Sequence, residues 1–295
     1  MGLLPHDIEI LPPCDDRVFK LIMTAPGAKP ALMNLVSAVI KRPVKDVWVR
    51  NNELPIGDTE EKAERLDLNC VTDDGSQVEI EMQASRIEEK KGNHRNLIGK
   101  STYYLCDLHS SQSSKGKPYD ELVRSYQITF CGYTIFPNRK SFINPFSMRH
   151  DMDNELLSDA IHAVFIELSK LNDLLKKPVD QMTDLEMWAV FLRYAEIPDC
   201  RDIVNRIIES KEALSVASEL LMSISQDERE RAIFRSRRIY QSDLESNMLT
   251  AKREGRAEGV ITIAQKALRK KMSIDDIIDI TGLTRKEIEK LSDAD

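Results

Sequence analysis

The sequence lacks the signals of several protein classes. No stretch approaches the roughly 18 consecutive apolar residues that a membrane helix needs, and the N-terminus has neither the basic start nor the apolar run of a signal peptide. The five cysteines are widely spaced and form no CxxC pair, which argues against a disulfide framework and a zinc site. The five histidines show no metal-ligand spacing. We therefore expect a reduced, cytoplasmic protein that makes no contact with a membrane.

The charge balance of the chain is acidic. Its formal net charge is −7, which argues against crude, non-specific attraction to nucleic acid. This charge does not exclude a nuclease, because acidic metal ligands contribute to it, but the sign must then reverse locally along the path of the DNA. Hydrophobic residues make up 41% of the chain, enough for a real core, and the 31% of charged residues suits long exposed helices.

Periodicity and turn signals divide the chain into two parts. Helices are predicted at residues 16–23, 31–40 and 93–110, and strands at residues 47–49, 125–130 and 161–168. The last of these strands is apolar enough to be buried on both faces. We expect a core domain over residues 1–200 and a helical C-terminal region over residues 201–295 that ends in a small helix-turn-helix. Trp48 and Trp188 are expected in the core.

A β-hairpin is the clearest local prediction. In residues 65–71, and again in residues 77–83, apolar side chains alternate with polar ones. The sequence Asp-Asp-Gly-Ser between them is a hairpin turn signal. Two strands of period two joined by this turn predict an antiparallel pair. Folding about the turn brings Asp67 close to Glu81 and Gln83, with positions 67 and 83 opposite each other.

The hairpin carries a candidate metal site. Asp67 and Glu81 would present carboxylates from adjacent strands, and the backbone carbonyl of Met82 is a candidate third ligand. Hard oxygen ligands suit Mg²⁺, with Mn²⁺ as an alternative, and such an ion activates water for phosphodiester hydrolysis. The other interpretation is a solvated sheet face, which alternating charges on a hairpin usually form. The spacing alone favours this second interpretation.

A set of short motifs resembles a known nuclease family, in order, over nearly the whole chain. The motifs are Asp16-x-x-Phe19-Lys20, Leu66-Asp67, Asp74-Gly75, Ile80-Glu81-Met82-Gln83, Arg95 with Tyr103-Tyr104, Ile166-Glu167-Leu168-Ser169-Lys170 and Thr281-Gly282-Leu283. They resemble the PD-(D/E)xK nuclease superfamily, and within it the branch of recombination-promoting nucleases and transposases. The resemblance implies an α/β fold, with a restriction-endonuclease-like core (a mixed central sheet flanked by helices) and a helical C-terminal extension. It also implies a Mg²⁺-dependent DNA endonuclease that hydrolyses phosphodiester bonds in recombination or transposition.

The resemblance assigns roles to residues of this chain. Asp67 and Glu81 would be metal ligands, and Asp16 a helix-borne acid near the metal. Gln83 would stand at the position of the superfamily's lysine, and a glutamine carries no charge. The cation that supports the transition state would then come from another residue, for which the candidates are Lys20, Arg95 and Lys100. The alternative is a catalytically weak or inactive protein that uses a nuclease fold to bind DNA or another protein.

Three features of the C-terminal region leave alternatives open. An arginine-rich stretch at residues 229–238 could track phosphates or, with its interleaved acids, form a solvated helix face. The terminal helix-turn-helix could enter a DNA groove or serve packing or oligomerisation. Small residues at positions 251, 255 and 259 share a helix face and would let another backbone approach. That face would suit a homodimer formed through the C-terminal region.

Overall fold

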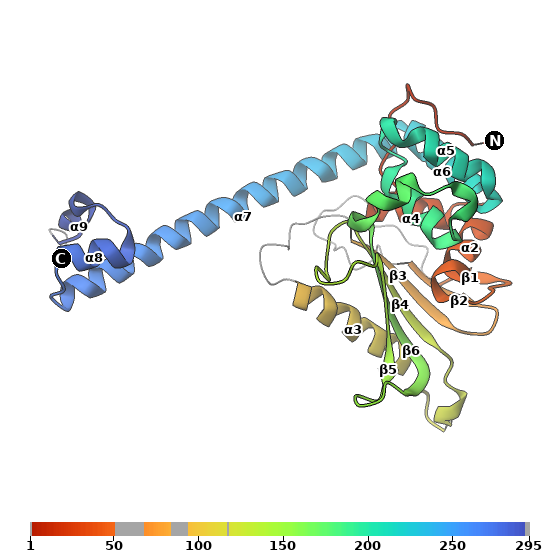
Figure 1. Ribbon diagram of the computed structural model, residues 1–295, viewed down its shortest axis with the longest axis horizontal. Helices are drawn as coiled ribbons and strands as arrows, with labels where there is room; N and C mark the ends of the chain where they lie inside the picture. The colour runs from red at the N-terminus through yellow and green to blue at the C-terminus, as the bar shows by residue number, and fades with distance from the viewer. Residues whose placement is uncertain (1, 51–67, 84–93, 117, 293–295) are drawn as a thin grey trace. The chain divides into compact units, whose positions relative to one another are not determined.

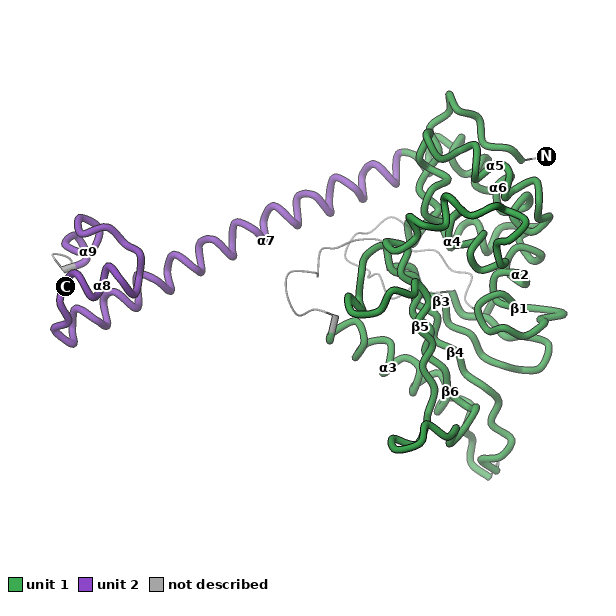
Figure 2. The backbone as a smooth tube through the Cα atoms, viewed as in Figure 1, with its two compact units in different colours: residues 1–231 green, residues 232–295 purple. Residues whose placement is uncertain are grey.

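The computed structural model describes residues 2–50, 68–83, 94–116 and 118–292. Contacts divide the chain into two compact units, residues 1–231 and residues 232–295 (Figure 2). Helices α5 (Arg201–Ser210) and α6 (Glu212–Gln226) pack against other helices of the first unit. The domain boundary expected at residue 200 stays a prediction.

The first unit is built on a six-stranded sheet (Figure 1). Its strands are β1 Val47–Val49, β2 Leu68–Thr72, β3 Gln77–Gln83, β4 Ser125–Cys131, β5 Ile143–Arg149 and β6 Leu156–Glu167. They lie in the order β1-β2-β3-β4-β6-β5. In the middle, β3, β4 and β6 are parallel, whereas β1, β2 and β5 join antiparallel at the margins. The sheet is therefore mixed, as predicted.

Helices cover both faces of this sheet. Besides α5 and α6 they are α1 Asp16–Thr24, α2 Lys29–Ile40, α3 His94–Ser110 and α4 Asp184–Tyr194, and 3-10 turns lie at Tyr119–Glu121, Leu168–Lys170, Asn172–Lys176, Val179–Gln181 and Pro198–Cys200. On one face α1 brings the ring of Phe19 to 6.1 Å from that of Phe130 in β4. On the other, α3 lies against β3, β4 and β6 (Figure 1). None of the helices in the described ranges is apolar over a length that could cross a lipid bilayer.

Side-chain caps explain why two of these helices begin where they do. The carboxylate of Asp15 accepts hydrogen bonds from the backbone N–H groups of Arg17 and Val18, at 3.0 and 3.1 Å, and so starts α1. Thr183 and Glu186 form a reciprocal capping box at the start of α4. The helix expected at residues 16–23 is thus confirmed.

The hairpin is confirmed, but its register differs from the prediction. Gly75 takes a φ of +82°, and the N–H of Thr72 donates to the carbonyl of Ser76 at 3.0 Å. These bonds centre the turn on Asp74, whose carboxylate accepts from the side chain of Thr72 at 2.6 Å. Leu68 is consequently paired with Ile80. The expected register, in which positions 67 and 83 would lie opposite each other, is therefore wrong by two residues over the described part of the hairpin.

The two tryptophans have different environments. Trp188 is fully buried in α4, as expected. Trp48 is 52% exposed, so its expected core position is wrong. The physical reason is its place on β1, the edge strand, where Val47 points into the core and the next side chain points out. The side chain of Lys29 covers its ring, with Nζ 5.6 Å from the centroid.

The far edge of the sheet was predicted only in part. β6 begins at Leu156, earlier than expected, and Leu157 in its first half is 72% exposed. Only the half that pairs with both β4 and β5 reaches the core, at Val164 and beyond. β5 was not predicted, and Pro145 within it is typical of an edge strand.

The second unit is a small helical bundle. The long helix α7 Glu228–Arg269 begins in the first unit, and its end packs with α8 Ile274–Thr281 and α9 Arg285–Ser292. The shared core consists of Ala264, Ala267, Ile277 and Ile288. The hydroxyls of Ser273 and Thr284 accept hydrogen bonds from the first turns of α8 and α9, and the turn between these helices uses a positive φ at Gly282. Among the described residues nothing lies within 4 Å of a Cβ built on Gly255 or Gly259, so the homodimer stays a prediction.

An ion cluster ties the start of the central strands to the segment after α2. The carboxylate of Asp159 accepts from Arg124 at 2.6 Å and from Arg42 at 2.7 Å. The hydrogen bond from Arg124 holds the pKa of Asp159 below its usual range. A carboxyl group with a lowered pKa adds stability above its unfolded-state pKa of about 3.9, and that stability is lost as the pH falls through the lower folded value.

Asp159→Asn should therefore destabilise the protein in a pH-dependent way. The side chain is 36% exposed, so solvent screening limits the loss in free energy of unfolding to about 1 kcal/mol at pH 7. Below the folded pKa the wild-type carboxyl is neutral too, and the difference should shrink. Urea unfolding at pH 7 and near pH 3 measures this. An equal loss at both pH values would contradict the role of the charge.

Candidate active site

The polar residues of β3 lie in a row beneath helix α3. Glu79, Glu81 and Gln83 share one face of the strand. The parallel register sets Gln127 and Thr129 of β4 beside the two glutamates. Both carboxylates are buried, Glu79 at 7% and Glu81 at 3% exposure. The hairpin does not present a solvated sheet face at these positions, because a helix that the alternation could not reveal covers it.

Lys100 of α3 reaches directly into this row. Its Nζ lies 2.7 Å from Oε1 of Glu81, and its ammonium also lies 5.3 Å from the centre of the Tyr104 ring. One residue along the helix, the hydroxyl of Ser101 lies 3.3 Å from that of Thr129, within hydrogen-bond distance. These contacts fix α3 across β3 and β4, so the position of the ammonium is set by the fold.

Two side chains in the row have polar atoms without a hydrogen-bond partner among the described residues. Oε2 of Glu81 is one such atom, and the amide of Gln127 supplies both of its polar atoms. Buried polar groups are nearly always paired, so unpaired ones need an explanation such as an ion or a water. A hard carboxylate oxygen that is buried and free to accept fits a divalent cation of the magnesium type.

Glu79 has an unusual protonation equilibrium. Burial, and then the neighbouring charge of Glu81, raise its pKa to about 7, whereas Lys100 opposes the shift. A substantial fraction of Glu79 is then protonated at neutral pH. The strand can thus hold two carboxyl groups close together without two full negative charges.

The predicted ligands fall in three places. Glu81 and Gln83 lie two residues apart on the same face of β3, and Gln83 is half-buried. The side chain of Met82 is buried on the opposite face, which leaves only its backbone for the expected role. Asp67 lies outside the described residues. Within the described residues no three acidic, histidine or cysteine side chains form a metal-binding group.

The predicted helix residues sit on the other side of the sheet. Asp16 opens α1, and its carboxylate accepts from the backbone N–H of Arg17 at 2.7 Å. Lys20, one turn further along α1, is fully buried. The role of Asp16 near a metal stays a prediction. Of the candidate cations, Lys100 contacts Glu81, with Nζ 2.7 Å from Oε1.

Comparison with known families agrees with this arrangement. The family described as PD-(D/E)XK nuclease family transposase matches residues 13–251. The chain belongs to this family. Its fold is therefore restriction-endonuclease-like, and nucleases of this kind generally use divalent metal ions and act on DNA. No curated protein and no solved structure matches the chain.

The family match does not cover the whole chain. It ends at residue 251, inside α7, so Gly255, Gly259 and the turn at Gly282 lie beyond it. The resemblance to PD-(D/E)xK nucleases and transposases is confirmed over residues 13–251. The C-terminal bundle is a part of this transposase-family chain for which the family supplies no role.

In this nuclease-family chain the Ile166 to Lys170 motif is structural. The carboxylate of Glu167 is fully buried at the end of β6. It accepts four hydrogen bonds of 2.5–2.9 Å, from the backbone N–H groups of Ile135 and Phe136, the amide of Asn144 and the ammonium of Lys170. The first two donors lie in the segment that follows β4. Glu167 therefore pins that segment beside the ends of the central strands.

Lys170→Met should destabilise the fold strongly. The change would leave the buried carboxylate of Glu167 without its counter-charge, which costs on the order of 3 kcal/mol or more. Urea unfolding measures the loss, and Lys176→Met, at an exposed position in the next 3-10 turn, is the matched control. Equal stabilities of the two variants would show that the pair has no such role.

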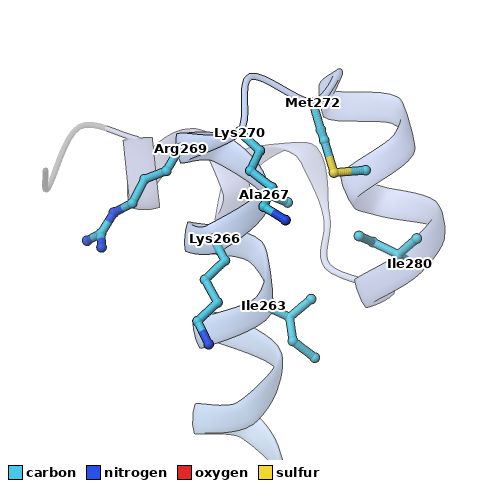
Figure 3. Close-up of a pocket in the computed structure, with 7 residues that line it drawn as sticks. All are labelled: Ile263, Lys266, Ala267, Arg269, Lys270, Met272 and Ile280. Carbon is cyan, nitrogen blue, oxygen red and sulfur yellow. The ribbon is translucent and has the colours of Figure 1, made fainter.

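The second unit has a hollow that does not suit this chemistry. It encloses about 430 Å³ at the end of α7 (Figure 3). Its lining residues are Ile263, Lys266, Ala267, Arg269, Lys270, Met272 and Ile280. Because no carboxylate lines it, this hollow cannot hold a hard divalent cation through side chains.

Proposed function

We propose that this family member is a metal-dependent DNA endonuclease that hydrolyses phosphodiester bonds in recombination or transposition. The observation that carries the proposal is Glu81. Its carboxylate is buried, stands on the hairpin strand where the family resemblance expects a ligand, and has one oxygen with no partner among the described residues. A buried charge of this kind is costly unless a counter-charge compensates it.

Asp67 is the proposed second ligand. The observed register pairs Leu68 with Ile80. Continued by one residue, it would set position 67 directly opposite Glu81, and side chains of directly opposed residues share a face. This register supports a carboxylate pair better than the pairing expected from the sequence. The backbone carbonyl of Met82 is the proposed third ligand, and Mg²⁺, or Mn²⁺ in its place, the proposed ion.

Different groups would bind the metal ion and the scissile phosphate. A divalent cation, when bound, supplies charge neutralisation and lowers the pKa of an attacking water. Oε2 of Glu81 is available to hold it, while Oε1 stays bound to Lys100. Water attack forms the new P–O bond as the bond to the 3′ oxygen breaks, which leaves a 5′-phosphate, as the resemblance implies.

Asp67→Ala and Glu81→Gln should each abolish Mg²⁺-dependent plasmid cleavage while the fold survives. Loss of a ligand removes the charge that stabilises the transition state, and we expect a fall of about 100-fold or more. Nicking and linearisation of supercoiled plasmid measure it. Asp120→Ala removes an exposed carboxylate and is the control that should cleave normally. Wild-type cleavage by Asp67→Ala would contradict the assignment.

The alternative function is DNA or protein binding without useful catalysis. Gln83 motivates it, because this side chain brings no charge to the position of the superfamily's lysine. Retention of DNA binding by the wild-type chain, with no cleavage in either Mg²⁺ or Mn²⁺, would favour the alternative.

A further inference from the structure

The candidate active site has a cation that comes from helix α3 instead of strand β3. We propose that Lys100 supplies at the scissile phosphate the positive charge that Gln83 cannot supply. The inference rests on the proposed nuclease function and names a residue that completes its site. It assigns the role to one of three cations that the sequence left open.

Burial places the ammonium at the boundary between the carboxylate and solvent. The side chain of Glu81 is 4% exposed, whereas that of Lys100 is 36% exposed. A substrate phosphate can approach only from the solvent side, so it would meet the ammonium before the carboxylate. An ammonium has three N–H donors, and the bond to Glu81 uses one of them.

The two oxygens of Glu81 serve different partners. Oε1 accepts from Lys100 at 2.7 Å, and Oε2 has no hydrogen-bond partner in the described part of the chain. Lys100 therefore does not occupy the oxygen proposed for the metal. A cation and the ammonium can flank one carboxylate, as they would have to if both act on the same phosphate.

Neighbouring contacts hold the ammonium in place. The ring of Tyr104, one helical turn along α3, lies 5.3 Å from Nζ and favours the charged form over its face. The contact of Ser101 with Thr129 fixes the helix at the adjacent residue. A preorganised donor stabilises developing charge without rearrangement during the reaction.

The other two candidate cations, Arg95 and Lys20, have different surroundings. Arg95 lies on the same helix but is exposed, and Lys20 is a buried residue of α1, the helix that packs on the opposite face of the sheet. Gln83 shares the face of Glu81 but is neutral. A positive charge at the position of Lys100 therefore compensates for the neutral residue on the strand.

The test compares two neutral variants with one charged variant. Lys100→Met and Lys100→Gln should each lower kcat for plasmid cleavage about 100-fold, because loss of one transition-state donor has an effect of this size. Lys100→Arg, which keeps the charge, should retain much more activity. Lys115→Met, at an exposed position just beyond α3, is the matched control and should cleave like the wild type. Lys100→Gln keeps a hydrogen-bond donor for Glu81, so it still tests the role of the charge if Lys100→Met fails to fold.

Manganese binding gives a readout that does not depend on cleavage. Removal of the ammonium takes away a positive charge close to the proposed metal and frees Oε1 of Glu81. Mn²⁺ should bind the two neutral variants as tightly as the wild type or more tightly, as measured by titration calorimetry. A merely structural ion pair predicts the opposite, because its loss would disorder the carboxylate and weaken binding of the ion.

Restoring a lysine on the strand tests whether the two positions are equivalent. Gln83→Lys in the Lys100→Met background should recover at least tenfold of the lost activity. Wild-type cleavage by Lys100→Met or Lys100→Gln would overturn the inference, and if Asp67→Ala is still inactive the nuclease function would stand. If the wild-type chain cleaves nothing, the proposed function fails and the inference fails with it.

Discussion

The candidate active site depends on the burial of the Glu81 carboxylate beneath helix α3. A carboxylate removed from water needs a counter-charge, and Lys100 supplies one at 2.7 Å. This pair links the strand to the helix, and the contact of Ser101 with Thr129 extends the link to β4. The polar groups between them are then fixed on two sides. The need of a buried carboxylate for a counter-charge thus explains why the polar side chains of β3 and β4 are held in place.

One face of the sheet packs into the apolar core, and the other carries the polar side chains of the candidate site. On the face toward α1, apolar side chains such as Ile80 and Phe130 are almost fully buried, and Phe130 packs against Phe19. On the face toward α3, the same strands carry carboxylates, amides and hydroxyls. The period of two in each strand makes this division automatic. Parallel pairing of β3 with β4 then aligns the polar residues of both strands in one row.

Much of this arrangement could be predicted from local signals, and the rest depends on tertiary packing. The hairpin, α1 and α4 follow from alternation, from the turn at Gly75 and from caps that act within a few residues. The predicted register of the hairpin differs from the observed one by two residues because the turn is centred on Asp74. The hydrogen bonds that centre it cannot be predicted from composition. The exposure of Trp48 depends on which strand is the edge. The burial of Glu81 likewise depends on where α3 docks, some 20 residues away in sequence.

The same distinction explains how a neutral residue can stand where the superfamily has a lysine. Transition-state stabilisation depends on where a charge lies relative to the phosphate, and any chain segment that reaches that point can supply it. Gln83 and Lys100 belong to different elements, but the contact of Lys100 with Glu81 brings them to one site. The sequence motif of strand β3 shows only that Gln83 is neutral where the superfamily has a lysine. Only the packing of α3 on that strand shows that the site as a whole keeps a positive charge.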